Sequence, residues 1–291
     1  MPWTRIGSGL LAGLIAFLIV VSGGWFFTLG IAAAVYLGQL EYFRMVEAKG
    51  MKPAKWPTLV LSQVLLLVSH VNPDWAEAIF PISGSLICFY LLFLPKLSSI
   101  ADIAASVMGL FYCGYLPGFW IRLRDLGQVP NLPLGGYLPP LDWLTHLPQL
   151  PQGLTMCFVS ILSVVAADIG AYAFGKRLGR TPLSHISPKK TLEGSIGGLF
   201  SSMFISTIGS WVLHWPGNPW SGMLLGVIVG VTSLLGDLTE SMMKRDAGFK
   251  DSGDLIPGHG GILDRTDSYL FTAPLIYYFT TMLLPWIGQF G

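Results

Sequence analysis

The sequence predicts an all-α integral membrane protein that crosses the bilayer about nine times, with its N-terminus in the cytoplasm. Hydrophobic residues make up 52% of the 291 positions and charged residues only 11%, and the mean hydropathy is +0.61. Soluble domains rarely have such a composition. Several apolar runs approach about 20 residues, the length that a membrane-spanning helix needs. We therefore expect the lipid bilayer as a partner, and no nucleic acid.

The apolar runs define the predicted spans in chain order. Arg5 and the run after it have the outline of a signal peptide, but a second run follows at once, so we expect an uncleaved first helix. The first span, which ends at Gly23–Gly24, and the short third span are the weakest. The nine candidates are Ile6–Val21, Trp25–Leu40, Thr58–Val71, Ala76–Leu94, Ile100–Ile121, Leu154–Phe174, Ile196–Leu213, Ser221–Leu238 and Thr266–Ile287.

The distribution of lysine and arginine supports this topology. With the N-terminus inside, 15 basic residues fall in cytoplasmic segments, whereas only Arg122 and Arg124 fall outside. Cytoplasmic loops of membrane proteins carry such an excess. We interpret the cytoplasmic segment Glu41–Pro57 as a solvated basic loop. The sequence thus indicates a multi-pass protein of the cytoplasmic (inner) membrane, and no loop is long enough to form a soluble domain.

Charged side chains concentrate in one stretch, residues 241–267. These 27 positions hold nine of the 33 charged residues, and a run of Ile-Pro-Gly-His-Gly-Gly lies between them. That run is too rich in glycine to form a helix. Charges of both signs around a loop between two membrane helices suggest a site for a phosphorylated substrate and its metal, facing the cytoplasm. The nine are Lys244, Arg245, Asp246, Lys250, Asp251, Asp254, Asp264, Arg265 and Asp267.

The helix that enters this stretch carries a polar stripe. At about 100° per residue, Ser233, Asp237, Glu240 and Lys244 lie on one side of it. Asp237 lies about one turn inside the charged boundary, where an isolated carboxylate is costly. It either forms an interhelical hydrogen bond or pairs with Lys244, or it binds a cation from an aqueous cavity. We favour the cation.

The last span opens with Asp264 and Asp267. Asp264 follows the glycine run and precedes Arg265, so a helix N-terminus, exposed backbone and an arginine together form an anion site. Asp264 would bring a divalent cation to that anion, and Mg²⁺ is the natural candidate because it binds one or two carboxylates together with substrate phosphates. For Asp267, helix capping is the alternative. His259 is expected to hold the glycine loop.

A second cytoplasmic loop, Gly175–Gly194, contributes Lys189 and Lys190. Asp168 is expected to be buried near the cytoplasmic end of the span before it, with Tyr172 one turn later. We interpret Asp168 as a polar cavity wall or substrate contact, with a core hydrogen bond as the alternative. The basic residues of both loops, facing carboxylates, are what a metal–triphosphate complex requires.

Several common sites are absent from the sequence. It contains no GxxxxGK[ST] loop, no HExxH, no Gly-x-Ser-x-Gly and no GxGxxG after a strand. These absences exclude P-loop hydrolases, zinc proteases and serine esterases of the usual types. Phosphate chemistry must therefore be built in another way.

The charged stretch resembles the hallmark motif of phosphatidate cytidylyltransferases (CDP-diacylglycerol synthases), with no departure. Two upstream stretches, Asp168–Tyr172 and Ser187–Gly194, are also similar to that family, so the resemblance covers roughly the C-terminal half. The first 150 residues match only as a series of apolar spans. The residues that carry the motif are Ser241, Lys244, Arg245, Lys250, Asp251, His259, Gly260, Gly261, Asp264, Arg265 and Asp267.

The resemblance implies an all-helical, homodimeric enzyme that converts CTP and phosphatidic acid to CDP-diacylglycerol and pyrophosphate. It implies Mg²⁺, and a second cation such as K⁺. We accordingly assign catalysis to Asp237, Asp264 and Lys250, with both aspartates on the metal. We divide the chain into N-terminal transmembrane helices (1–121), a proline-rich extracytoplasmic loop (122–153) and a C-terminal catalytic transmembrane domain (154–291). The expected substrate-binding residues are Asp168, Lys189, Lys190, Ser241, Lys244, Arg245, Asp251, His259, Arg265 and Asp267.

Two other functions fit part of the pattern. A secondary transporter of an anionic solute would also carry buried aspartates, but the sequence has no internal repeat and its charges gather on one face. A polyprenol or phytol kinase would also use a nucleoside triphosphate at a membrane site. The intact motif favours the cytidylyltransferase.

Overall fold

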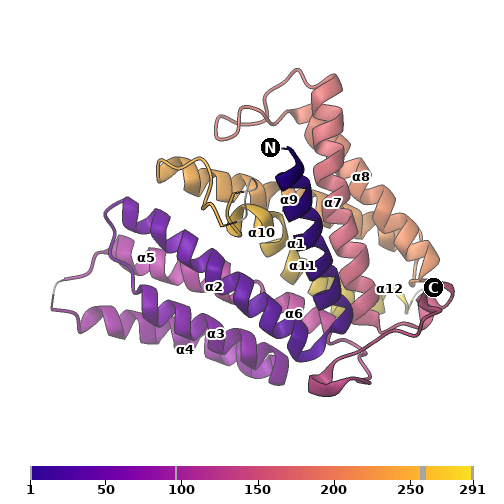
Figure 1. The fold of residues 1–291 in the computed structure, drawn as a ribbon, viewed down its shortest axis with the longest axis horizontal. Coiled ribbons are helices and arrows are strands. Elements are labelled where there is room, and N and C mark those ends of the chain that lie inside the picture. Colours follow the sequence, from indigo (N-terminus) through magenta and orange to yellow (C-terminus); the bar gives the residue numbers. More distant parts are fainter. Residues whose placement is uncertain (1, 96, 256–259, 290–291) are drawn as a thin grey trace. The chain divides into compact units, whose positions relative to one another are not determined.

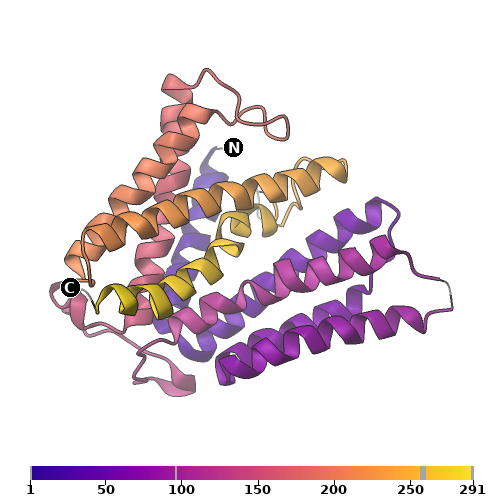
Figure 2. The same cartoon turned by 180° about the vertical axis from the view of Figure 1, so that it is seen from behind.

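A computed structural model describes residues 2–95, 97–255 and 260–289, and within them the secondary structure is helical, with no strand (Figures 1 and 2). The predicted all-α membrane fold is thereby confirmed. In this described part, seven helices are long and apolar enough to cross a membrane. The two weakest predicted spans correspond to the apolar stretch Gly9–Ser22 of the first helix and to the short helix Lys55–Val71, so the number nine and the side of the N-terminus stay predictions. The seven are Gly24–Ala48, Pro73–Leu92, Ile100–Arg124, Gln152–Leu178, Leu192–Val212, Trp220–Asp246 and Leu263–Ile287.

The chain folds into two compact units that alternate along the sequence. The first consists of Met1–Arg122, Pro130–Tyr137 and Met243–Thr266. The second consists of Leu123–Val129, Leu138–Met242 and Asp267–Gly291. Much of the motif stretch therefore folds with the N-terminal helices. The linear division into three segments stays a prediction.

The first unit is a set of apolar helices joined by short turns (Figure 1). The first helix ends where the glycine pair predicted, because Gly23 adopts a positive φ of 60° that favours glycine. The residues Ala54, Leu65, Ile87, Leu91 and Leu110 form a buried cluster among these helices. The elements are α1 Pro2–Ser22, α2 Gly24–Ala48, α3 Lys55–Val71, α4 Pro73–Leu92, α5 Ile100–Gly109, a π-helical segment Leu110–Tyr115, α6 Gly118–Arg124, whose last two residues belong to the second unit, and a short turn Pro133–Gly135.

Buried polar contacts also join the helices of this unit. On α2, Gln39 donates from Nε2 to Ser62 Oγ on α3 (2.6 Å) and to the Gly109 carbonyl on α5 (3.0 Å). Such contacts stabilise membrane helices because lipid offers no alternative partner. They fix α2 against its neighbours, which matters for the site below.

In the second unit, α7 and α8 run side by side in both views (Figures 1 and 2). Small residues allow the close approach: a Cβ on Gly198 would lie 2.7 Å from the Ala167 carbonyl, and Gly170 lies against Ser201. Membrane helices commonly associate through such positions. The elements are two short turns, Trp143–Thr145 and Leu147–Gln149, then α7 Gln152–Leu178, α8 Leu192–Val212, α9 Trp220–Asp246, α10 Leu263–Leu270, α11 Thr272–Tyr278, a π-helical segment Phe279–Leu283 and α12 Leu284–Ile287. The end of α9, from Met243, and the start of α10, up to Thr266, belong to the first unit.

The proline-rich segment that follows α6 contains only short helical turns. However, its predicted first residues belong to α6, which ends at Arg124. The Arg122 guanidinium is buried over the Phe119 ring (4.5 Å to the centroid) and donates to Glu77 Oε1 (3.2 Å). This cation–π contact and ion pair explain why an arginine expected in an outside loop closes a helix instead.

Candidate active site

The Asp264 carboxylate lies in a network of donors at the start of α10. Its Oδ2 accepts hydrogen bonds from the backbone N–H of Ser252 (2.9 Å), the Ser252 hydroxyl (3.0 Å) and the backbone N–H of Gly261 (2.8 Å). Its Oδ1 contacts Lys244 Nζ at 2.6 Å. A carboxylate with this many donors is held in one position and keeps its negative charge.

Lys244 and Asp264 form a buried ion pair within the first unit. Their side chains are only 11% and 7% exposed. Lys244 lies near the end of α9, on the polar stripe predicted from the sequence. A buried pair of this kind costs desolvation, so it is a weak source of stability. Its position inside the motif points to function.

Asp237 forms a second lysine–aspartate pair, in the second unit. Its Oδ2 is bonded to Lys190 Nζ, and its Oδ1 accepts from Ser241 Oγ at 3.3 Å. Both charged side chains are a little more than a quarter exposed. Lys244, which the sequence offered as an alternative partner of Asp237, pairs with Asp264 instead. The favoured role of Asp237 as a cation ligand stays a prediction.

The loop between α7 and α8 is folded so that it presents Lys190. The Glu193 carboxylate accepts the backbone N–H groups of Arg180 (3.1 Å) and Thr181 (3.2 Å). Thr191 caps α8 by accepting the N–H of Gly194 (3.1 Å). Contacts across the base of the loop therefore hold it from both ends, and Lys190 lies just before the cap.

Most of the remaining predicted site residues, which lie outside the two lysine–aspartate pairs, are exposed. Arg245 donates to the Phe249 carbonyl at 3.3 Å, and Asp267 is buried with its Oδ1 accepting from Ser268 N at 2.7 Å. His259 lies outside the described residues. The exposed ones are Asp168, Lys189, Arg245, Lys250, Asp251 and Arg265.

Asp168 corrects one expectation, since its side chain is exposed rather than buried. Helix α7 packs against α8 through Ala167, Gly170 and Phe174. With this helical spacing, Asp168 and Tyr172 lie on another side of α7, and both are exposed.

Glu41 is a site residue that the sequence analysis missed. The segment expected to be a solvated loop continues α2 to Ala48, and Glu41 is 9% exposed. Its carboxylate accepts from Ser252 Oγ (2.8 Å), Ile262 N (3.0 Å) and Leu263 N (2.9 Å). The available signal was an acidic residue at the end of an apolar run, which also suits a solvated helix end.

The carboxylates of Asp237 and Asp264 are the type of ligand that a divalent cation such as Mg²⁺ binds. Within the described ranges, no three or more His, Cys, Asp or Glu side chains form a metal cluster. Mg²⁺ does not require one, because it binds one or two carboxylates along with substrate phosphates and water. Both Asp237 and Asp264 offer carboxylate oxygens, and each has a lysine ammonium beside it. An exchange of lysine for metal would therefore leave the charge of each carboxylate balanced.

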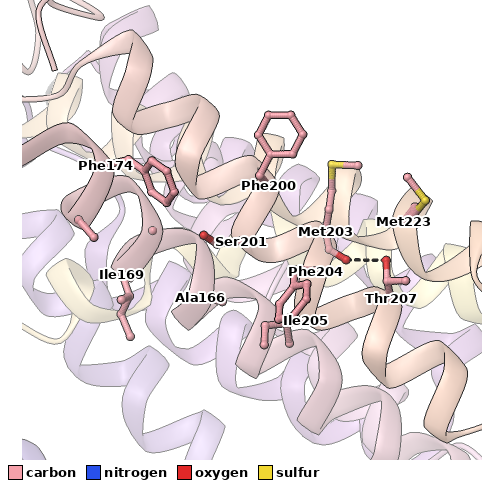
Figure 3. A pocket seen from close by; sticks show the side chains of 12 residues that line it. Ala166, Ile169, Phe174, Phe200, Ser201, Met203, Phe204, Ile205, Thr207 and Met223 are labelled. Atoms are coloured by element: carbon pink, nitrogen blue, oxygen red, sulfur yellow. Dashed lines mark hydrogen bonds between the residues drawn. The ribbon is translucent and has the colours of Figure 1, made fainter. Parts of the chain in front are cut away.

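A separate apolar pocket of about 820 Å³ lies among α7, α8 and α9 (Figure 3). Phe174, Phe200 and Phe204 contribute to its wall, and Thr207 bonds to the Met203 carbonyl at 2.7 Å. None of the described residues that line it is ionisable. The pocket therefore offers no charged side chain to a phosphate.

Fold and site together define a polytopic helical membrane protein that carries lysine–aspartate pairs suited to anionic, phosphorylated ligands. The chain belongs to the cytidylyltransferase family, whose model matches residues 3–283. The match includes the N-terminal half, which the motif resemblance did not reach.

Named relatives are similar over nearly the whole chain. A phosphatidate cytidylyltransferase of Synechocystis is 55% identical over 98% of this chain and 98% of its own length. Phosphatidate cytidylyltransferase 4 (chloroplastic) of Arabidopsis thaliana is 39% identical over 98% of this chain and 74% of its own length. The phosphatidate cytidylyltransferase of Bacillus subtilis is 31% identical over 94% of this chain and 96% of its own length.

Proposed function

We propose that this protein is a phosphatidate cytidylyltransferase, which converts CTP and phosphatidic acid to CDP-diacylglycerol and pyrophosphate. The observation that carries the proposal is the 55% identity to a phosphatidate cytidylyltransferase along almost the entire chain. The lysine–aspartate pairs and the glycine-rich loop supply the groups that this reaction requires.

The reaction needs charge neutralisation more than a protein nucleophile. A phosphate oxygen of the lipid attacks the α-phosphorus of CTP, a new P–O bond forms, and the bond between the α- and β-phosphates breaks to release pyrophosphate. The attacking oxygen is already an anion, so a strong base is unnecessary. The barrier comes from repulsion between two anions and from charge that builds up on the leaving group.

We assign phosphate binding to the lysines of the two pairs. In the structure, Lys244 and Lys190 neutralise Asp264 and Asp237. With substrate and a metal ion bound, each ammonium would contact a phosphate oxygen in place of its carboxylate, which would keep opposite charges together. The exposed cations Lys250, Arg245 and Arg265 are suited to the outer phosphates, and Lys189 adds to them.

We assign metal binding to Asp237 and Asp264, with Mg²⁺ as the ion and K⁺ as a second cation. A bound divalent cation would lower the negative charge of the triphosphate and its leaving group. The protein holds one of these ligands by the three donors on Asp264 Oδ2. Ser241, Asp251, Asp267, Asp168 and His259 complete the proposed substrate site.

The proposed setting is the cytoplasmic face of the inner membrane, with nine spans and a homodimeric assembly. The excess of basic residues in the predicted cytoplasmic segments supports this orientation. Phosphatidic acid would then arrive from the bilayer and CTP from the cytoplasm.

The test is an assay of the purified protein in detergent with CTP, Mg²⁺ and phosphatidic acid. We expect pyrophosphate and CDP-diacylglycerol in equal amounts, no reaction with ATP in place of CTP, and loss of activity with EDTA that Mg²⁺ restores. A lipid kinase would release a nucleoside diphosphate, and a transporter would release neither product. Either of these results would reject the proposal.

A further inference from the structure

We propose that Glu41, on α2, is a positioning residue for catalysis, because it fixes the loop and helix start that carry Asp264. The inference rests on the proposed function. It connects the N-terminal half of the chain to the motif stretch within one folded unit.

The start of α10 lacks a capping side chain of its own. The residues before it are Gly260, Gly261 and Ile262, and none has a side-chain acceptor for the first N–H groups of the helix. Glu41 provides these acceptors from α2, at 3.0 Å from Ile262 N and 2.9 Å from Leu263 N. The negative charge also suits the positive end of the helix dipole.

Ser252 connects the Glu41 and Asp264 carboxylates. Its hydroxyl oxygen lies 2.8 Å from Glu41 Oε2 and 3.0 Å from Asp264 Oδ2. The hydroxyl has one proton to donate, so it serves one carboxylate at a time. The Ser252 backbone N–H, at 2.9 Å, continues to hold Asp264 meanwhile. The position of Asp264 is therefore linked to that of Glu41 through one residue.

Two glycines of the motif stretch leave room for the Glu41 side chain. A Cβ on Gly253 would lie 2.6 Å from Glu41 Oε1. A Cβ on Gly261 would collide with both Glu41 and Ser252. The glycine-rich composition thus serves close packing around a carboxylate, in addition to any approach of a ligand.

The C-terminal end of α2 contacts residues 246–249, just after Lys244, at two more positions. Lys49 Nζ pairs with Asp246 Oδ1 at 3.0 Å, and the Arg44 guanidinium lies 5.8 Å from the centroid of the Phe249 ring. These pairs are exposed or peripheral, so they contribute little. Glu41 makes the buried contact of the three, and Ser252 Oγ, Ile262 N and Leu263 N all donate to its carboxylate. An amide in its place would set a donor against a donor.

The experiment compares Glu41→Gln with Gln39→Met in the full-length protein. Gln39 is the matched control because it is buried on the same helix, and its bonds to Ser62 and Gly109 do not reach the loop. For each variant we would measure kcat, KM for both substrates, the Mg²⁺ concentration that gives half-maximal rate, and hydrogen exchange of the amides in residues 260–270.

For Glu41→Gln we expect kcat to fall about 10- to 100-fold, as for residues that orient metal ligands. The Mg²⁺ requirement should rise, KM for phosphatidic acid should stay unchanged, and the amides at the start of α10 should exchange faster. Gln39→Met should lower thermal stability while kcat and exchange at α10 stay near those of the wild type.

Three results would overturn the inference. They are unchanged exchange at α10 in Glu41→Gln, faster exchange with unchanged kcat and Mg²⁺ requirement, and an equal loss of kcat in Gln39→Met. An inactive wild type would instead reject the proposed function. The exchange measurement would still decide whether Glu41 holds α10.

Discussion

Replacing Asp264 by asparagine puts a donor where the structure has only acceptors. If the amide nitrogen takes the Oδ1 position, it faces Lys244 Nζ, which is 2.6 Å away in the wild type. If it takes the Oδ2 position, it faces donors from Ser252 and Gly261. In both orientations the charge beside Lys244 is lost in a buried setting. Removing one partner of a buried ion pair costs about 3–5 kcal/mol of folding stability.

Asp237→Asn is the matched comparison. Its side chain is 29% exposed and its partner Lys190 is 27% exposed, so solvent can replace the lost contact. We expect a stability change of about 1 kcal/mol or less. Both variants should fail to release pyrophosphate, because both remove a proposed metal ligand. The two changes should therefore differ in stability and agree in activity.

The assay is thermal unfolding of both variants in detergent, with pyrophosphate release measured on the same samples. At about 2–4 °C per kcal/mol, Asp264→Asn should lower Tm by roughly 6–20 °C and Asp237→Asn by less than about 4 °C. An Asp264→Asn protein as stable as the wild type would refute the buried network. Full turnover in either variant would refute the metal assignment.

Three further outcomes concern the lysine loop and the glycine run. Lys190→Met should lower kcat more than about tenfold with little change in Tm, since its pair is partly exposed; a normal kcat would remove Lys190 from the site. Gly261→Ala should lower Tm, because its Cβ collides with Ser252 and Glu41; an unchanged Tm would contradict that packing. Glu193→Gln should make residues 180–191 more sensitive to protease, because Glu193 holds the N–H groups of Arg180 and Thr181; equal cleavage rates would argue against this anchor.

Hydropathy predicted the fold class because the length and composition of each apolar run determine by themselves whether it can cross a bilayer as a helix. The third span was weak for a physical reason, since Lys55–Val71 is a helix of only 17 residues. The motif stretch showed directly that charges of both signs gather between two apolar runs. These are properties of short segments, which the sequence displays directly.

Pairing between distant segments could not be predicted in the same way. Spacing along α9 allowed Lys244 as an alternative partner of Asp237, but Lys244 pairs with Asp264, and Lys190 reaches Asp237 from another loop. Glu41 has the same local pattern as an acid at a solvated helix end. Its role depends on residues more than 200 positions later. The hydrophobicity of the surrounding run predicted that Asp168 is buried. Its exposure depends instead on which side of α7 packs against α8.

The order of synthesis gives the alternating units a consequence for biogenesis. Residues 243–266 complete the first unit, yet the ribosome adds them after more than four-fifths of the chain. The N-terminal helices must therefore enter the bilayer before these residues are synthesised. During that interval the Glu41 carboxylate lacks its hydrogen-bond donors from Ser252, Ile262 and Leu263. A nascent chain that stops before these residues would leave the Glu41 carboxylate without the donors that it contacts in the folded protein.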